Sequence, residues 1–84
     1  QFCDAGALRP DPADFAAVIA DAVDLREQCG GGALPLAALL GALPPDIPLS
    51  IELRSAALRE AFSQPALRAK AVLDATRGWL ETQA

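Results

Sequence analysis

The segment IPLSIEL, residues 47–53, alternates apolar and polar side chains. This alternation predicts a β-strand with Ile51 and its apolar neighbours on one face and Glu52 on the other. A carboxylate on a buried strand face is costly unless it is paired, binds a metal or lies in a solvated pocket. At the carboxyl end of a parallel strand such a pocket is often an active site. Glu52 is therefore the first candidate for a functional residue.

Helix and turn signals divide the rest of the chain. Asp11-Pro12 is typical of an N-cap followed by a proline in the first helical position, and three glycines from residue 30 end the helix that begins there. A short, almost wholly apolar helix and a long amphipathic helix capped by Ser63 follow. The expected elements are a strand at 1–5, helices at 11–28 and 35–43, the strand at 47–53, a helical turn at 56–62 and a helix at 63–82.

The order of these elements predicts an α/β fold that is mostly helical by residue count. Two strands joined through helices are most simply parallel. Two parallel strands alone leave both faces and both edges of their sheet uncovered. The chain also starts at Gln1 and contains no methionine. We therefore expect a single carboxy-terminal fragment, residues 1–84, of a larger α/β domain.

Length, charge and hydropathy exclude several classes of protein. The chain has 84 residues, which allows one small domain at most, and 52% of them are hydrophobic, which is too many for a disordered tail. A net charge of −4 argues against binding to nucleic acid or to an anionic membrane surface. No apolar stretch approaches the roughly 20 residues that span a bilayer, and no signal peptide is evident. We expect a cytoplasmic protein without a membrane or nucleic-acid partner.

The two cysteines, Cys3 and Cys29, do not form a CxxC pair, and the chain has no histidine. A zinc site of the usual Cys and His type is therefore not expected. Two reduced thiols in a cytosolic protein are favoured over a disulfide in a secreted one.

The order of motifs resembles one family. A strand ending at Asp4, a helix, Arg26 before a Gly-x-Gly turn, a short apolar helix and Leu-Ser-Ile-Glu ending at Glu52 resemble the carboxy-terminal part of sugar phosphate isomerases and epimerases. These belong to the xylose-isomerase-like TIM-barrel superfamily. The resemblance implies that the chain is the last quarter of a (β/α)8 barrel, strands seven and eight with their helices. The helix at 11–28 would then be an insertion after strand seven, on the active-site face.

The resemblance also implies an activity for the full-length parent, with the isolated chain inactive. The parent would be a divalent-metal-dependent isomerase or epimerase acting on a small sugar or sugar phosphate, with Mg, Mn, Co or Zn as the metal. Glu52 matches the glutamate that binds the metal and transfers a proton beside the substrate carbonyl, which is chemistry that a carboxylate can perform. The remaining ligands would come from the remainder of the barrel. The alternative for Glu52 is an ion pair with Arg54 or Arg9.

Two further residues are implied as substrate-binding, each with an alternative. Arg26 matches an arginine that contacts substrate oxygens, but it could instead interact with carbonyls at a helix end. Asp4 could line the pocket or cap a loop. The chain departs from the family at Gln1, where many relatives have a metal-binding histidine. It also departs at Gly31, where many have a glutamate; the glycines are expected to act as a hinge rather than to hold phosphate.

Other functions stay open. The chain could be a non-catalytic, acidic helical interaction module that buries the apolar helix at 35–43 against a partner or a second copy. It could also belong to a pseudoenzyme barrel or to an endonuclease-like phosphodiesterase. The absence of histidine argues against the multi-zinc site of such a nuclease.

Overall fold

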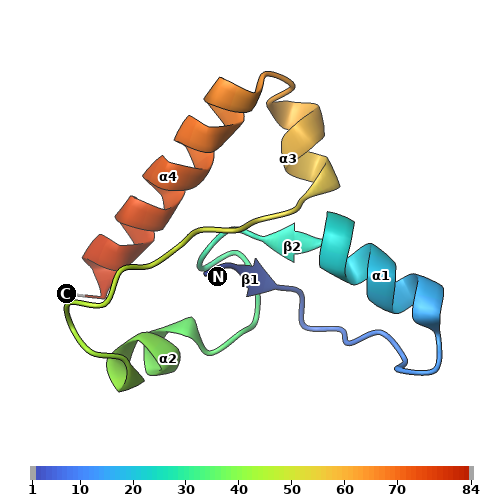
Figure 1. Ribbon diagram of the computed structural model, residues 1–84, viewed down its shortest axis with the longest axis horizontal. Helices are drawn as coiled ribbons and strands as arrows, with labels where there is room; N and C mark the ends of the chain where they lie inside the picture. The colour runs from blue at the N-terminus through green and yellow to red at the C-terminus, as the bar shows by residue number, and fades with distance from the viewer. Residues whose placement is uncertain (1, 84) are drawn as a thin grey trace.

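A computed structural model describes residues 2–83. About half of the chain is helical and the strands form one two-stranded sheet, which confirms an α/β fold that is mostly helical. The elements, shown in Figure 1, are β1 (Asp4–Ala5), α1 (Phe15–Asp24), β2 (Arg26–Glu27), α2 (Leu36–Ala42), α3 (Ala56–Ala61) and α4 (Pro65–Thr82).

Two segments that are distant in sequence contact β1 and the residues just before it. Strand β2 pairs with β1 in antiparallel register, with Asp4 opposite Glu27. A parallel bridge joins Phe2, just before β1, to Ile51, and the Phe2 amide donates to the Ser50 carbonyl at 2.7 Å. The two segments that the sequence predicts as parallel strands therefore do run parallel where they touch.

The strand expected over residues 47–53 is reduced to the bridge at Ile51. Pro48 lacks an amide hydrogen and so cannot donate to a ladder, which weakens regular pairing in the first half of the segment. Of the strand expected over 1–5, the structure contains β1 and an isolated bridge at Phe2. Gln1 lies outside the described residues. The sheet partner that the sequence did not predict is β2.

The helix expected over 11–28 is shorter at both ends. It begins at Phe15, and its N-cap is Asp14, whose carboxylate accepts from the Ala17 amide at 3.1 Å. Asp11 instead accepts from the Ala13 amide and holds a turn before the helix. At the other end, residues 26–27 pair with β1 instead of continuing the helix.

The other helices lie within a few residues of their expected positions. The helix expected over 35–43 is α2, and the turn expected over 56–62 is α3. The last helix, α4, begins at Pro65 and its N-cap is Gln64, which makes no capping hydrogen bond through its side chain. Ser63 is therefore not the cap that the sequence predicts.

Helix α4 covers one face of the strand segments. The Phe2 ring lies 5.8 Å from the Trp79 ring, centroid to centroid, in a tilted arrangement. Ile51 and Leu53 line a hollow with side chains of α4. Glu52, between them, is exposed, and the alternation of the segment turns it to the opposite face. The two-face pattern predicted from the sequence is thus present although the regular strand is not.

The buried core is very small. Phe2, Ala5 and Leu36 are the buried apolar residues among those described. The accessible surface is 5969 Å², against about 4,700 Å² for a compact protein of 8.7 kDa, so about 1,200 Å² more is exposed. The radius of gyration of 13.6 Å also exceeds the roughly 12 Å expected for this length. The chain is flat and open, 38 × 31 × 18 Å (Figure 1).

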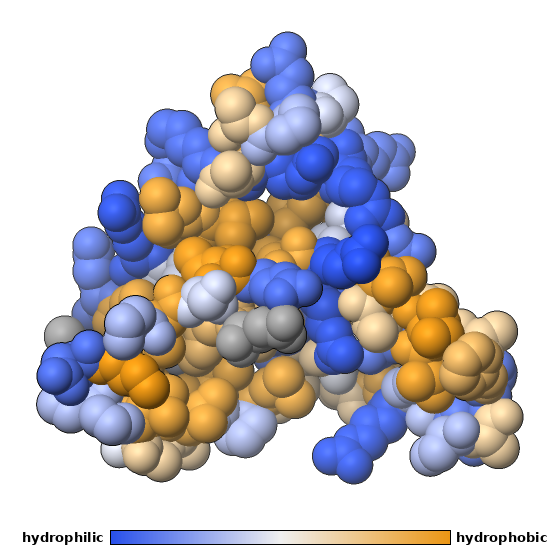
Figure 2. All heavy atoms as spheres, in the orientation of Figure 1, coloured by the Kyte–Doolittle hydropathy of each residue, from blue (hydrophilic) through white to orange (hydrophobic). Residues whose placement is uncertain are grey.

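The apolar helix faces that the sequence predicts as buried are largely uncovered. Phe15 of α1 is 77% exposed and Ile19 is 45% exposed. In α2 only Leu36 is buried, and Leu39 is 47% exposed. Figure 2 shows apolar side chains on the surface over α1 and around α2. The burial that the sequence predicts for these helix faces is therefore not observed among the described residues.

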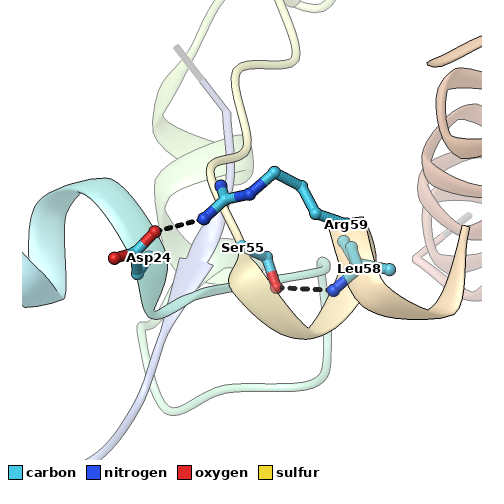
Figure 3. Close-up of polar contacts among 4 residues, drawn as sticks. All are labelled: Asp24, Ser55, Leu58 and Arg59. Carbon is cyan, nitrogen blue, oxygen red and sulfur yellow. Dashed lines mark hydrogen bonds and ion pairs between the residues drawn. The ribbon is translucent and has the colours of Figure 1, made fainter. Parts of the chain in front are cut away.

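Polar contacts fix α3 against α1 (Figure 3). Ser55 is buried and is the N-cap of α3, where its hydroxyl accepts from the Leu58 amide at 3.2 Å. Arg59, one turn later, forms an ion pair with Asp24 at the end of α1. Ser55 also bridges Leu25 across the chain, so the start of α3 is held by backbone and side chain together.

Replacement of Ser55 by alanine is expected to lower the free energy of unfolding by about 1 kcal/mol, because the first turn of α3 loses its cap. Chemical denaturation of the protein that contains this chain measures the change. Ser63→Ala is the matched control and is expected to leave stability unchanged within about 0.5 kcal/mol. Equal losses from the two substitutions would contradict the assigned cap.

Candidate functional site

Glu52 is exposed and free of protein partners within the described part of the chain. Neither Arg54 nor Arg9 forms an ion pair with it, so the alternative of a salt-bridged Glu52 is not observed. The carboxylate is held on a backbone that is fixed at Ile51 by the bridge to Phe2. It is therefore available to a ligand on the face of the sheet that α4 does not cover.

Arg26 is placed by β2 and not by a helix end. Helix α1 ends at Asp24, and the Arg26 amide donates to the Arg54 carbonyl at 3.1 Å. The half-buried guanidinium lies 3.4 Å from the Asp21 carboxylate, measured between Nη1 and Oδ2. The alternative reading of Arg26 as a partner of helix-terminal carbonyls is thus not observed.

Asp4 is 1% exposed and its carboxylate is fully used within the chain. One oxygen accepts from the amides of Ala5 and Leu34, both at 2.9 Å. The other accepts from the amides of Gly30 at 3.2 Å and Gly32 at 3.1 Å. A carboxylate has about four acceptor positions, so these four donors leave none for a ligand. The geometry favours the loop-capping role that the sequence left open.

The amide donors also determine the protonation state of Asp4. Burial by itself raises the pKa of the carboxyl group, because it disfavours the charged form. The hydrogen bonds from Leu34, Ala5, Gly32 and Gly30 stabilise the carboxylate and together outweigh burial. The pKa of Asp4 is therefore below its ordinary value of 3.8, and the group is charged at neutral pH.

The glycine turn is built around this carboxylate. Gly30 has a φ of +83°, and a Cβ on Gly32 would lie 2.3 Å from the Ala5 carbonyl oxygen. Only glycine fits at residue 32, because the loop passes so close to β1 there. The amides of Gly30 and Gly32 donate to the Asp4 carboxylate. The glycine turn is therefore attached to β1 and does not have the free ends that a hinge requires. The sequence signal that could have revealed this link is the pairing of a strand-end acid with closely spaced glycines.

The structure separates the three candidate residues into two groups. Asp4 lines a hollow with Trp79 of α4, on the side that α4 covers. Arg26 is opposite Ala5 in the sheet and so lies on the other face, which is also the face of Glu52. Glu52 and Arg26 therefore share one face, and Asp4 does not belong to it.

The residues that the structure describes do not form a metal site by themselves. Among residues 2–83, no three His, Cys, Asp or Glu side chains lie close enough together to hold a metal ion. Glu52 offers one exposed carboxylate, a ligand type that suits Mg²⁺, Mn²⁺ and Zn²⁺. Gln1, which the sequence resemblance aligns with a metal-binding histidine, lies outside the described residues. Among the described residues, Glu52 alone of the candidate ligands combines exposure with a free carboxylate, and one carboxylate does not fix a metal ion.

Both cysteines are free thiols. Cys29 lies near the α4 residue Thr76, with Sγ and Oγ1 3.9 Å apart, and burial raises the pKa of the thiol. A protonated, half-buried thiol is a poor nucleophile, so Cys29 is a packing residue. Over residues 2–83, no helix has the length and apolar character needed to cross a membrane.

Comparisons of the chain with protein-family models, with curated proteins and with solved structures gave no match.

Asp4→Asn is expected to lower the free energy of unfolding by about 2–3 kcal/mol, because the new amide group cannot accept from two of the four buried donors. Asp11→Asn removes the same charge at an exposed position and is expected to change stability by at most about 0.5 kcal/mol. Denaturant titration of both variants measures the difference. Similar values for the two would show that the carboxylate does not hold the loop.

The same contact predicts a pH dependence. Because folding lowers the pKa of Asp4, the carboxylate stabilises the folded state fully above its ordinary pKa of 3.8. This contribution is lost as the pH falls below 3.8 through the folded-state pKa. The stability difference between the parent chain and Asp4→Asn should therefore be constant near neutral pH and shrink below about pH 4. A difference that grows with acidification would contradict the assignment.

Proposed function

We propose that this chain forms the last two strand–helix units of a (β/α)8 barrel, and that the whole barrel is a divalent-metal-dependent isomerase or epimerase of sugars or sugar phosphates. The observation that carries the proposal is Glu52: a partner-free carboxylate on the uncovered face of a strand segment whose other face is packed on α4. In a barrel, the helix layer lies outside and the opposite strand face lies inside.

Two further observations support the barrel. The contact between Phe2 and Ile51 is parallel, as neighbouring barrel strands require. The excess exposed surface and the uncovered faces of α1 and α2 are what strand–helix units present when neighbouring units are not included. In this arrangement β1 belongs to strand seven, residues 47–53 to strand eight and α4 to the eighth helix.

Glu52 and Arg26 have separate roles in the proposed reaction. Isomerisation and epimerisation move a proton at a carbon beside a carbonyl, and a carboxylate such as Glu52 can take and return that proton. Glu52 would also be a ligand of a divalent ion, which when bound would polarise the substrate oxygens. The guanidinium of Arg26 would hold substrate oxygens by forked hydrogen bonds on the same face. Asp4 would act indirectly, by fastening the loop that follows β2.

A non-catalytic interaction module is the second candidate. The exposed apolar side chains of α1 and α2 favour it, because monomeric proteins rarely leave several such faces uncovered. In that case, Glu52 would be an ordinary solvated side chain and the apolar faces would bind a partner protein or a second copy.

Glu52→Gln tests the catalytic role in the intact barrel protein that contains this chain. The amide cannot transfer the proton and is a weaker metal ligand, so turnover should fall by about 100-fold or more and metal affinity by at least about tenfold. Glu60→Gln, which removes the same charge from the exposed surface of α3, is the control and should change neither. Unchanged turnover and metal affinity in Glu52→Gln would show that the role is wrong.

Sedimentation of the purified 84-residue chain separates the two candidates. A barrel fragment is expected to aggregate or to lack a cooperative unfolding transition, because three buried apolar side chains are too few for a stable core. A monomer that unfolds cooperatively would contradict the barrel proposal. A discrete dimer with a cooperative transition would support the interaction module.

A further inference from the structure

A cleft beside the sheet contains two arginines that come from different parts of the chain. It lies between the segment that follows β1, the end of α1, β2 and the loop before α2, and its volume is about 330 Å³. This volume is at the lower end of the range for small-molecule sites, roughly 300–1,000 Å³. The walls include Gly6, Arg9, Asp21, Arg26, Ala33 and Leu34.

The charges around the cleft are positive in balance. Arg9 and Arg26 are the cations and Asp21 is the acid that lines it. The chain as a whole carries a net charge of −4, so this cleft has the opposite sign to the protein around it. A local concentration of positive charge on an acidic protein attracts anions to one place.

Both guanidinium groups have donors to spare. Within the described residues Arg9 has no ion pair, and Arg26 has one, with Asp21 at 3.4 Å. That distance is longer than the roughly 2.7–2.9 Å of a strong charge-assisted hydrogen bond. Each guanidinium has five N–H donors in a fork that matches the oxygens of phosphate and carboxylate. The ion pair with Asp21 therefore orients the Arg26 guanidinium and leaves most of its N–H donors free for a ligand.

The floor of the cleft is held by hydrogen bonds. The Ala33 amide donates to the Ala5 carbonyl at 2.8 Å, and the Asp4 carboxylate holds Leu34 and the glycine turn against β1. Arg26 is fixed by its pairing with Ala5 in the sheet. The part of the cleft that carries Arg26 is thus held in place before a ligand binds, which reduces the entropic cost of binding a small ion.

We propose that Arg9 and Arg26 form a binding site for an oxyanion, the phosphate or carboxylate group of the substrate. That this oxyanion belongs to the substrate rests on the proposed isomerase function; anion binding at the cleft does not. Arg26 lies on the same sheet face as Glu52, so an anionic group held in the cleft leaves the rest of a sugar on the face where Glu52 is exposed. The substrate class is then an anionic sugar, a sugar phosphate or a sugar acid, and not a neutral sugar.

Titration of the intact protein with inorganic phosphate, followed by calorimetry in the presence of a chelator, tests the site without the metal. Arg9→Gln and Arg26→Gln should each weaken phosphate binding by about tenfold or more, since each loses a charge-assisted contact. Arg77→Gln removes the same charge from the exposed surface of α4 and should bind phosphate as the parent protein does.

Asp21→Asn gives a prediction of opposite sign. Removing the acid frees Arg26 and raises the local positive charge, so phosphate affinity should rise about two- to fivefold. A merely structural role of the Arg26–Asp21 pair would make this variant bind more weakly or not differently. Acetate, titrated in the same way, distinguishes the two anions: the tighter ligand identifies the group that the cleft selects.

The proposal would be overturned if Arg9→Gln and Arg26→Gln bound phosphate as Arg77→Gln does, or if Asp21→Asn lowered the affinity or left it unchanged. Thermal unfolding of each variant checks that the fold is kept. These measurements do not involve Glu52 or a metal. Failure of the Glu52→Gln test with intact phosphate binding would therefore refute the isomerase and leave the anion site, and the reverse result would refute only the anion site.

Discussion

The arrangement of this chain depends on one buried carboxylate. Asp4 receives four backbone amides, one from its own strand and three from the loop between β2 and α2. An isolated charge at 1% exposure would be strongly destabilising, and four donors make it favourable. Because three of the donors belong to one loop, the carboxylate keeps that loop, and with it β2, against β1. The position of Arg26 follows from this attachment.

The two carboxylates that the sequence singles out, Asp4 and Glu52, differ in how the structure uses them. Asp4 is buried, saturated and of lowered pKa, and lies on the side that α4 covers. Glu52 is exposed and unpaired, and lies on the uncovered face. The family resemblance gives both residues a place near a substrate, but hydrogen bonding separates their roles. A group whose acceptor positions are all occupied holds structure, whereas a group with free lone pairs can accept a ligand or a proton.

The element types could be predicted from the sequence because local signals decide them. Glycine and proline at the helix ends and the 3.6-residue periodicity between them predict four helices. The alternation at residues 47–53 predicts that Glu52 and Ile51 lie on opposite faces. Element boundaries were less predictable. The first helix ends before Arg26 because β1 offers a sheet partner, and Ser63 is not a cap because Gln64 takes the N-cap position. The end of the first helix depends on a distant strand, and the cap of the last helix depends on competition between neighbouring residues. Helix propensity alone predicts neither.

By itself, the sequence determined an α/β, mostly helical chain, the two faces of the segment around Glu52, and apolar helix surfaces that need covering. These follow from short-range periodicity and from the cost of exposing apolar area. Only the tertiary structure decided that Asp4 fastens a loop, that β2 exists, and that Arg9 and Arg26 line a common cleft. Each of these depends on backbone amides or side chains brought together from opposite ends of a long stretch of sequence. Their partners are chosen by distance in space, which no local pattern encodes.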